Sequence, residues 1–218
     1  MKIKSVSVLT VYLGLSSGKH KIGRLAVRDR RIYFEYDPDF RATGLEISPF
    51  KLPVKAGLIE GDLAYFDGLH GVFNDSLPDG WGRLLIDRQL RSNGIAPEAL
   101  TLLDRLAHVG HHGMGALLYE PDYSEDVSGG DLNLDKLANE SFQVLEGESE
   151  DIFAELLTLN GSSAGARPKV MVGINSDFTS VIHGVDDLTQ DYTHWMVKFP
   201  SSTDVKDIGA VEYAYSLM

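Results

Sequence analysis

Apolar and polar residues alternate through the first quarter of the chain, as they do in half-buried β-strands. The segment SVSVLTVYLG alternates first, and GKHKIGRLAVRDRRIYFEYDP then gives two further runs separated by Asp29 and Arg30. Such runs, bounded by turn-forming residues, predict strands between residues 3 and 54. The chain therefore begins with a β-rich region.

Helical spacing replaces the alternation after Leu77. The segment PDGWGRLLIDRQLRSNG, residues 78–94, has a proline and an aspartate ahead of apolar residues at helical spacing and ends in Asn-Gly, which predicts a helix. A second short helix is expected after Pro97, ending at Gly110. Trp81, near the start of the first helix, is expected to pack beneath that helix.

Further along the chain, DIFAELLTLNG has apolar residues on one helical face and predicts a helix over residues 151–161. The segments PKVMVGI, TSVIHGV and YTHWMVKFP then predict strands. A last helix is expected in DIGAVEYAYSLM, with Ile208, Val211, Tyr215 and Met218 on one side. Because this helix lacks a cap and a following turn, we expect a truncated part of a longer protein.

The charges are unevenly distributed. The chain carries a net charge of −12, yet residues 1–118 hold 15 basic and 13 acidic residues, whereas residues 119–218 hold 5 and 19. Such a shift in composition indicates a domain boundary. We therefore expect one domain at residues 1–118 and another at residues 119–218, the second opening with an acidic surface connector.

Composition excludes several classes of protein. The absence of cysteine excludes disulfides, thiolate catalysis and cysteine-ligated zinc. The acidic balance disfavours direct binding of nucleic acid, and no apolar run approaches the roughly 20 residues that cross a bilayer. His108, His111 and His112 resemble a metal cluster, but adjacent histidines point in different directions, so no metal site is expected. We expect a cytoplasmic protein.

The segment GSSAG, residues 161–165, admits two functional interpretations. It fits the G-x-S-x-G nucleophile elbow of hydrolases with Ser163 as nucleophile, but that elbow needs a strand before the serine and a helix after it. Here a helix is predicted before it, and a β run follows Pro168. Small residues followed by Arg167 and Lys169 favour a phosphate-binding loop, with a plain turn as the alternative.

A lysine near the end of a predicted strand supports the phosphate interpretation. Lys198 in YTHWMVKFP lies between Val197 and Phe199, which predicts a buried ammonium group. Burying an uncompensated charge costs free energy. Nucleotide phosphates would compensate this charge, as they do for the strand lysine of kinases.

At these motifs the chain resembles the HipA toxins, serine/threonine kinases of bacterial type II toxin–antitoxin modules. The resemblance covers nearly the whole chain and rests on GVFNDSLPDGWGRLLIDRQL, LLDRLAHVGHHGMGALLYEP, SSAGARPKVMV, HWMVKFP and VEYAYSLM, in this order. It implies an α+β fold, with a β-rich HipA-type N-subdomain at residues 1–118 followed by an incomplete protein-kinase-like N-lobe.

The resemblance also assigns roles to single residues. The regulatory autophosphorylated serine falls on Ser162, with Ser163 as the alternative, and Glu212 would orient Lys198 as a helix glutamate does in protein kinases. The residues that would contact ATP are Ser163, Ala164, Gly165, Lys169 and Lys198.

The catalytic motifs of such kinases have no counterpart in the sequence. It contains no His-x-Asp followed by Asn at kinase spacing, and Asp177-Phe178 is followed by Thr179 and precedes Lys198, the wrong order for a magnesium-binding motif. We therefore expect no catalytic residue within the chain and no phosphate transfer by it alone. The alternative is a non-catalytic binding or regulatory module derived from the kinase N-terminus.

The resemblance implies cofactors and partners as well. ATP with Mg²⁺ would serve the complete protein. A helix-turn-helix antitoxin, HipB-like, would neutralise the toxin and supply the contact with DNA. Glutamyl-tRNA synthetase is the best-known type of protein substrate in this family, and no membrane contact is expected.

Overall fold

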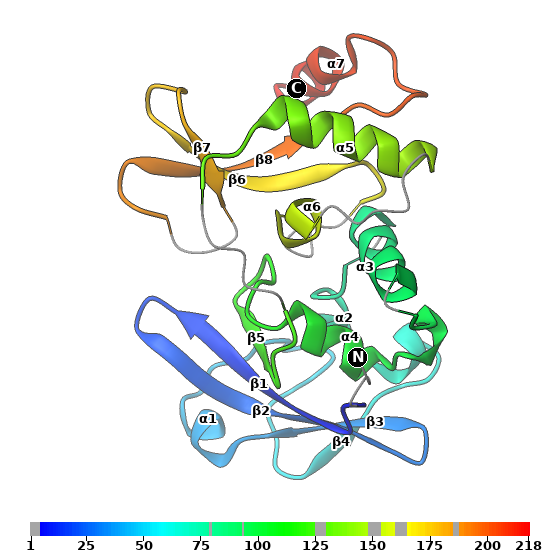
Figure 1. The fold of residues 1–218 in the computed structure, drawn as a ribbon. Helices are drawn as coiled ribbons and strands as arrows, with labels where there is room; N and C mark the ends of the chain where they lie inside the picture. Colours follow the sequence, from blue (N-terminus) through cyan, green and yellow to red (C-terminus); the bar gives the residue numbers. More distant parts are fainter. Residues whose placement is uncertain are drawn as a thin grey trace. The chain divides into compact units, whose positions relative to one another are not determined.

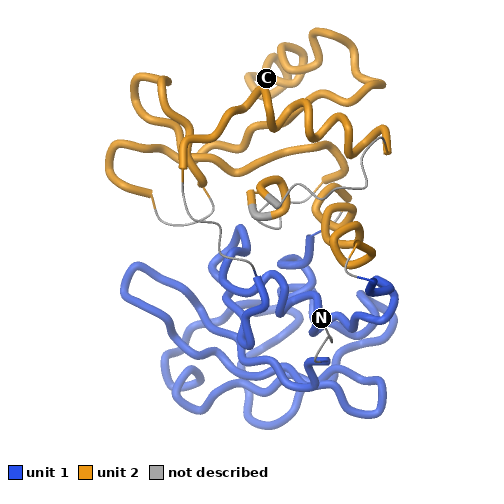
Figure 2. Tube along the Cα trace, viewed as in Figure 1, with its two compact units in different colours: residues 1–78, 93–126 blue, residues 79–92, 127–218 orange. Residues whose placement is uncertain are grey.

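The computed structural model describes residues 5–78, 80–92, 94–124, 130–147, 154–159, 165–184 and 188–218. The chain divides into two compact units, shown in different colours in Figure 2. Unit 1 comprises residues 1–78 and 93–126, and unit 2 comprises residues 79–92 and 127–218. Each unit contains an antiparallel sheet and several helices, so the fold class is α+β (Figure 1).

Unit 1 is built on a five-stranded antiparallel sheet with the strand order β4-β3-β2-β1-β5. Its strands are β1 (Val8–Leu15), β2 (Gly18–Arg28), β3 (Arg31–Tyr36), β4 (Leu58–Glu60) and β5 (Leu117–Glu120). Asp29 and Arg30 join β2 to β3, and both have positive φ, as tight two-residue hairpin turns often require.

The strand pattern that the sequence predicts as far as residue 54 ends at Tyr36. Asp37 instead caps a short helix, α1 (Pro38–Ala42), by accepting the backbone N–H of Asp39 at 3.0 Å. Pro38 favours this start, because the first N–H of a helix needs no partner within the helix. The remaining residues as far as 54 form turns and irregular chain, so local capping overrides the alternation there.

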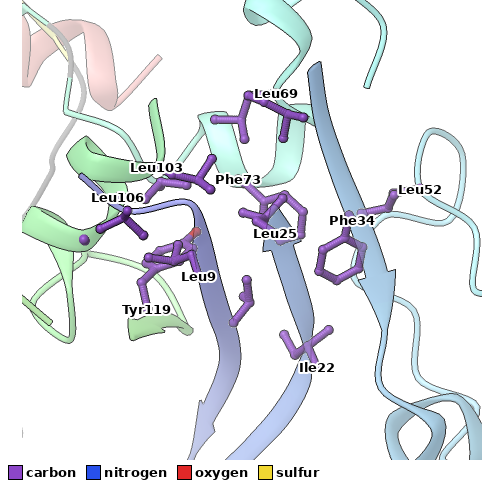
Figure 3. Packing of buried hydrophobic residues seen from close by; sticks show 14 of the residues in the cluster. Leu9, Ile22, Leu25, Phe34, Leu52, Leu69, Phe73, Leu103, Leu106 and Tyr119 are labelled. Atoms are coloured by element: carbon purple, nitrogen blue, oxygen red, sulfur yellow. The ribbon is translucent and has the colours of Figure 1, made fainter. Parts of the chain in front are cut away.

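The other helical elements of unit 1 are short: η1 (Phe66–Gly68), α2 (Gly71–Asn74), η2 (Pro97–Ala99) and α4 (Leu102–Val109). The helix predicted after Pro97 is thus a 3₁₀ turn followed by α4, because Thr101 caps α4. Figure 3 shows the core, where Leu9, Leu25 and Phe34 of the sheet pack with Phe73 of α2 and Leu103 of α4.

Unit 2 contains a three-stranded antiparallel sheet with the order β7-β6-β8. Its strands are β6 (Lys169–Asn175), β7 (Val181–His183) and β8 (Tyr192–Lys198), and its helices are α3 (Gly80–Ser92), α5 (Leu134–Glu146), α6 (Ala154–Leu159) and α7 (Ile208–Ser216). None of the helices in the described ranges has the length and apolar character to cross a bilayer.

The core of unit 2 forms between one face of the sheet and three of the helices. Val170 and Val172 of β6 are fully buried there. The helices contribute Trp81 and Leu85 from α3, Leu137 and Val144 from α5, and Leu156 and Leu159 from α6. The first half of the acidic stretch, which was expected to be a connector, begins with the end of β5, and residues 125–129 lie outside the described residues. The second half forms α5, a helix that the sequence did not predict.

Asp104 is a buried carboxylate on which the N-terminal part of unit 1 depends. It is 2% exposed and accepts the backbone N–H of Val6 at 2.6 Å and both the N–H and hydroxyl of Thr101 at 2.8 Å. Replacing Asp104 with Ala should lower the free energy of unfolding by about 3 kcal/mol, because buried donors lose their acceptor. The control Asp62→Ala removes an exposed carboxylate that accepts the N–H of Ala64 and should cost far less. Urea unfolding of both variants measures the difference, and equal losses would contradict the role of Asp104.

Candidate functional site

A cleft of about 490 Å³ in unit 2 brings together five of the residues that the sequence suggested for a phosphate site: Gly165, Arg167, Lys169, Lys198 and Glu212. The other residues that line it are Ala166, Ile208, Val211 and Tyr215. The sheet and the segment before β6 supply its cationic side chains, whereas α7 supplies the apolar side chains and the carboxylate of Glu212. The cleft therefore has a charged wall and an apolar wall.

The pairing of β6 with β8 sets the two lysines opposite one another. Lys169 is the first residue of β6 and Lys198 the last of β8, and they are partners in the antiparallel register. Partners in such a register project on the same face of the sheet, with Cβ atoms roughly 5 Å apart. Two like charges at this spacing repel, so an anion bound between them would be favoured.

The buried lysine of this pair is Lys169, which is 3% exposed, and the prediction of burial for Lys198 is wrong. The side chain of Lys198 is 44% exposed, because β8 is an edge strand of the sheet. Its apolar neighbours Val197 and Phe199 contribute to the core of unit 2. Since adjacent residues of a strand point to opposite faces, their burial says nothing about the environment of Lys198.

Gly165 allows the amine of Lys169 to lie against the segment that precedes β6. The glycine has φ +113°, and a Cβ atom placed on it would lie 2.5 Å from Nζ of Lys169. Any other residue would be strained by its backbone angle and would displace the lysine. Local geometry therefore requires glycine at the point where the loop meets the cationic face of the sheet.

Two ion pairs hold the edges of the cleft. Nζ of Lys198 donates to Oε1 of Glu212 on α7, and this hydrogen bond holds the pKa of the Glu212 carboxyl below its usual value. Arg167 donates to Oδ1 of Asp204 at 2.6 Å. The other oxygen of Asp204 accepts the N–H and hydroxyl of Ser201, and these bonds, with the backbone one foremost, lower the pKa of Asp204.

The cleft concentrates positive charge in an acidic part of the chain. Residues 119–218 hold only 5 basic residues against 19 acidic ones. Three of those five, Arg167, Lys169 and Lys198, line this one cleft. Such a local concentration attracts anions even when the net charge of the chain is negative.

The residues of the cleft fit phosphate groups better than a metal ion. Mg²⁺ is held by oxygen ligands, and Glu212, already paired with Lys198, is the one carboxylate among the described residues that line the cleft. In the described ranges of the chain, no three histidine or carboxylate side chains gather in a metal-binding arrangement. In unit 1, Nε2 of His111 lies 3.5 Å from Oε1 of Glu120, and its Nδ1 lies 3.4 Å from Oδ2 of Asp122.

Ser162, Ser163 and Ala164 lie outside the described residues, so their expected roles in regulation and ATP contact stay predictions.

Sequence reasoning missed Asp204 as a partner of Arg167. The spacing Ser201-x-x-Asp204 could have indicated that Asp204 is held in a turn, because such a spacing is typical of a side chain that accepts hydrogen bonds within its own turn. The apolar lining from α7 did have a signal, because the predicted apolar side of that helix includes Ile208, Val211 and Tyr215.

The fold and the cleft together define an α+β protein with a cationic cleft beside a small antiparallel sheet. Residues 13–120, which include most of the unit 1 sheet, match the family described as HipA N-terminal domain. This part of the chain is therefore similar to the N-terminal domain of the HipA family. Searches of curated proteins and of solved structures gave no significant match to the chain.

The ion pair between Lys198 and Glu212 predicts a pH dependence of the link between β8 and α7. Because the pKa of Glu212 is lowered in the folded state, the pair stabilises this link at neutral pH, and the contribution is lost as the pH falls through the lowered pKa. Carboxyl NMR titration of Glu212 should show the lowered pKa, and Lys198→Met should raise it. Lys206→Met, a matched control in the segment before α7, should leave it unchanged. A pKa of Glu212 that does not respond to Lys198→Met would contradict the pairing.

Proposed function

We propose that this chain is the N-terminal portion of a HipA-like, ATP-dependent protein serine/threonine kinase, the toxin of a bacterial toxin–antitoxin module. The observation that carries the proposal is the pair of lysines, Lys169 and Lys198, that face the same cleft from adjacent strands beside Gly165. The HipA N-terminal domain in the same chain supports this origin. The antiparallel sheet of unit 2, with its strand lysine and helix glutamate, would be the beginning of a kinase-like N-lobe.

The two walls of the cleft suit the two ends of a nucleotide. Lys169 and Lys198 would bind phosphate oxygens, while Ile208, Val211 and Tyr215 offer apolar contact. Glu212 would keep the ammonium group of Lys198 in place when the cleft is empty. ATP would supply the phosphoryl group that the complete kinase transfers, and its Mg²⁺ would need ligands other than the described residues of this cleft.

Catalysis is not assigned to any residue of this chain. The sequence lacks a catalytic-loop aspartate and the metal-binding residues that follow it in kinases, so the chain is expected to bind nucleotide without transferring phosphate. Phosphorylation of Ser162 would place a charge near −2 beside the cationic wall, where it would compete with the nucleotide for the same donors. Ser162 is therefore proposed as a regulatory site of the complete protein.

The partners we propose follow from the family and from charge. A HipB-like helix-turn-helix antitoxin would neutralise the kinase and carry the DNA contact, since a chain with net charge −12 is poorly suited to bind nucleic acid by itself. Glutamyl-tRNA synthetase exemplifies the type of protein substrate. The second candidate is a non-catalytic binding or regulatory module, which the missing catalytic motifs favour and which predicts no need for nucleotide.

Nucleotide affinity separates the two candidates. The chain should bind ATP in calorimetry, and Lys169→Met and Lys198→Met should each weaken binding about tenfold or more, because each removes a charge-assisted hydrogen bond to phosphate. Lys206→Met keeps the residues of the cleft and should bind like the unaltered chain. Lys198→Met should remain folded, since the side chain is half-exposed. Absence of ATP binding, or equal affinity in all variants, would contradict a nucleotide site and favour the binding module.

A further inference from the structure

The first turn of α3 lies against the segment that forms the cationic edge of the cleft. The backbone N–H of Trp81 donates to the carbonyl oxygen of Gly165 at 3.0 Å. Gly165 and the next residue, Ala166, both line the cleft. A helix distant in sequence therefore makes a direct backbone hydrogen bond to the wall of the proposed phosphate site.

Gly80 makes this close approach possible. A Cβ atom at residue 80 would lie 2.6 Å from the carbonyl oxygen of Gly165 and 2.7 Å from Cα of Ala166, closer than real side chains come to a backbone. The φ of Gly80 is +39°, an angle that side-chain-bearing residues rarely adopt. The start of α3 and the loop segment are thus fitted to one another without intervening side-chain atoms.

The helix end that makes these contacts is firmly anchored. Trp81 is fully buried and Leu85, one turn later, is 2% exposed, and both belong to the core of unit 2. Moving the first turn of α3 would disturb that core, so the helix gives residues 165–169 a fixed surface to lie against. On the other side of the segment, Arg167 is held by Asp204.

We propose that Gly80 and the N–H of Trp81 position residues 165–169 and thereby set the affinity of the cleft for phosphate groups. The inference rests on the proposed function and adds positioning residues to it. A peptide unit is planar, so a hydrogen bond to the carbonyl of Gly165 also sets the direction of the N–H of Ala166. The contact with α3 thus orients a backbone donor of the cleft wall, and it holds Gly165 where the amine of Lys169 lies against it.

The test is Gly80→Ala with Gly94→Ala as its matched control. Gly94 follows the other end of α3, has φ +73° and has no atom within 4 Å of a Cβ placed on it. Both substitutions therefore add a methyl group at a positive-φ glycine, but only the one at residue 80 pushes on Gly165 and Ala166. Any effect common to both variants reflects backbone strain, and the excess in Gly80→Ala reflects the contact.

Calorimetry with ATP, inorganic tripolyphosphate and adenosine gives the functional result. Gly80→Ala should bind ATP and tripolyphosphate at least about tenfold more weakly, the equivalent of one lost charge-assisted hydrogen bond, with adenosine binding unchanged. Gly94→Ala should bind all three like the unaltered chain. Equal polyphosphate affinity in Gly80→Ala and Gly94→Ala overturns the positioning role, as does an equal loss of adenosine binding, which indicates general damage.

Amide NMR spectra without ligand keep the inference separate from the proposed function. Gly80→Ala should shift the resonances of Ala166, Arg167 and Lys169, and unshifted resonances overturn the inference. If the unaltered chain binds no polyphosphate, the proposed nucleotide site fails, and shifted resonances then support the contact with α3 alone. Should Gly80→Ala fail to fold, a backbone ester at residue 81 removes the N–H donor but keeps the indole, and the same measurements apply.

Discussion

The antiparallel register of β6 and β8 is the constraint on which the cleft depends. It sets two lysines side by side on one face of the sheet, where their charges repel unless negative charge lies near them. Glu212 brings one such charge from α7, and it links a helix with no buried residue to the edge of the sheet. The ion pair between Lys198 and Glu212 therefore joins the cationic face of the sheet to α7, a largely exposed apolar helix.

The strands that carry these lysines serve two purposes through their two faces. Val170, Val172 and Val197 pack into the core of unit 2, whereas Lys169 and Lys198 face the cleft. Alternation along a strand separates the residues that stabilise the fold from those that hold a ligand. A change of charge on the cleft face can therefore alter binding while the core on the other face stays intact.

The sequence predicted the features that depend on local pattern and missed those that depend on which element covers a face. The strands of unit 2 and the helices α3 and α7 have clear periodicity, so they were predictable. The exposure of Lys198 was not predictable, because its apolar neighbours lie on the other face of the sheet. Lys169 is the more buried of the two lysines because β6 is the central strand and β8 an edge strand. α5 was hidden by its acidic composition, although Asn133 caps it and Leu137 and Val144 are buried.

The helix α3 belongs both to the segment that matches the HipA N-terminal domain and to the unit that contains the cleft. Its residues 80–92 lie within the matched range 13–120, yet Trp81 and Leu85 complete the core of unit 2 rather than that of unit 1. The change in charge near residue 118 divides the chain by position in the sequence. In the structure, α3 precedes that position but packs with α5, α6 and β6, which follow it. The backbone N–H of Trp81 also donates to the carbonyl oxygen of Gly165. A helix from the matched residues 13–120 therefore supports the wall of the cleft. A substitution in the first turn of α3 would therefore affect the wall of the cleft as well as the core of unit 2.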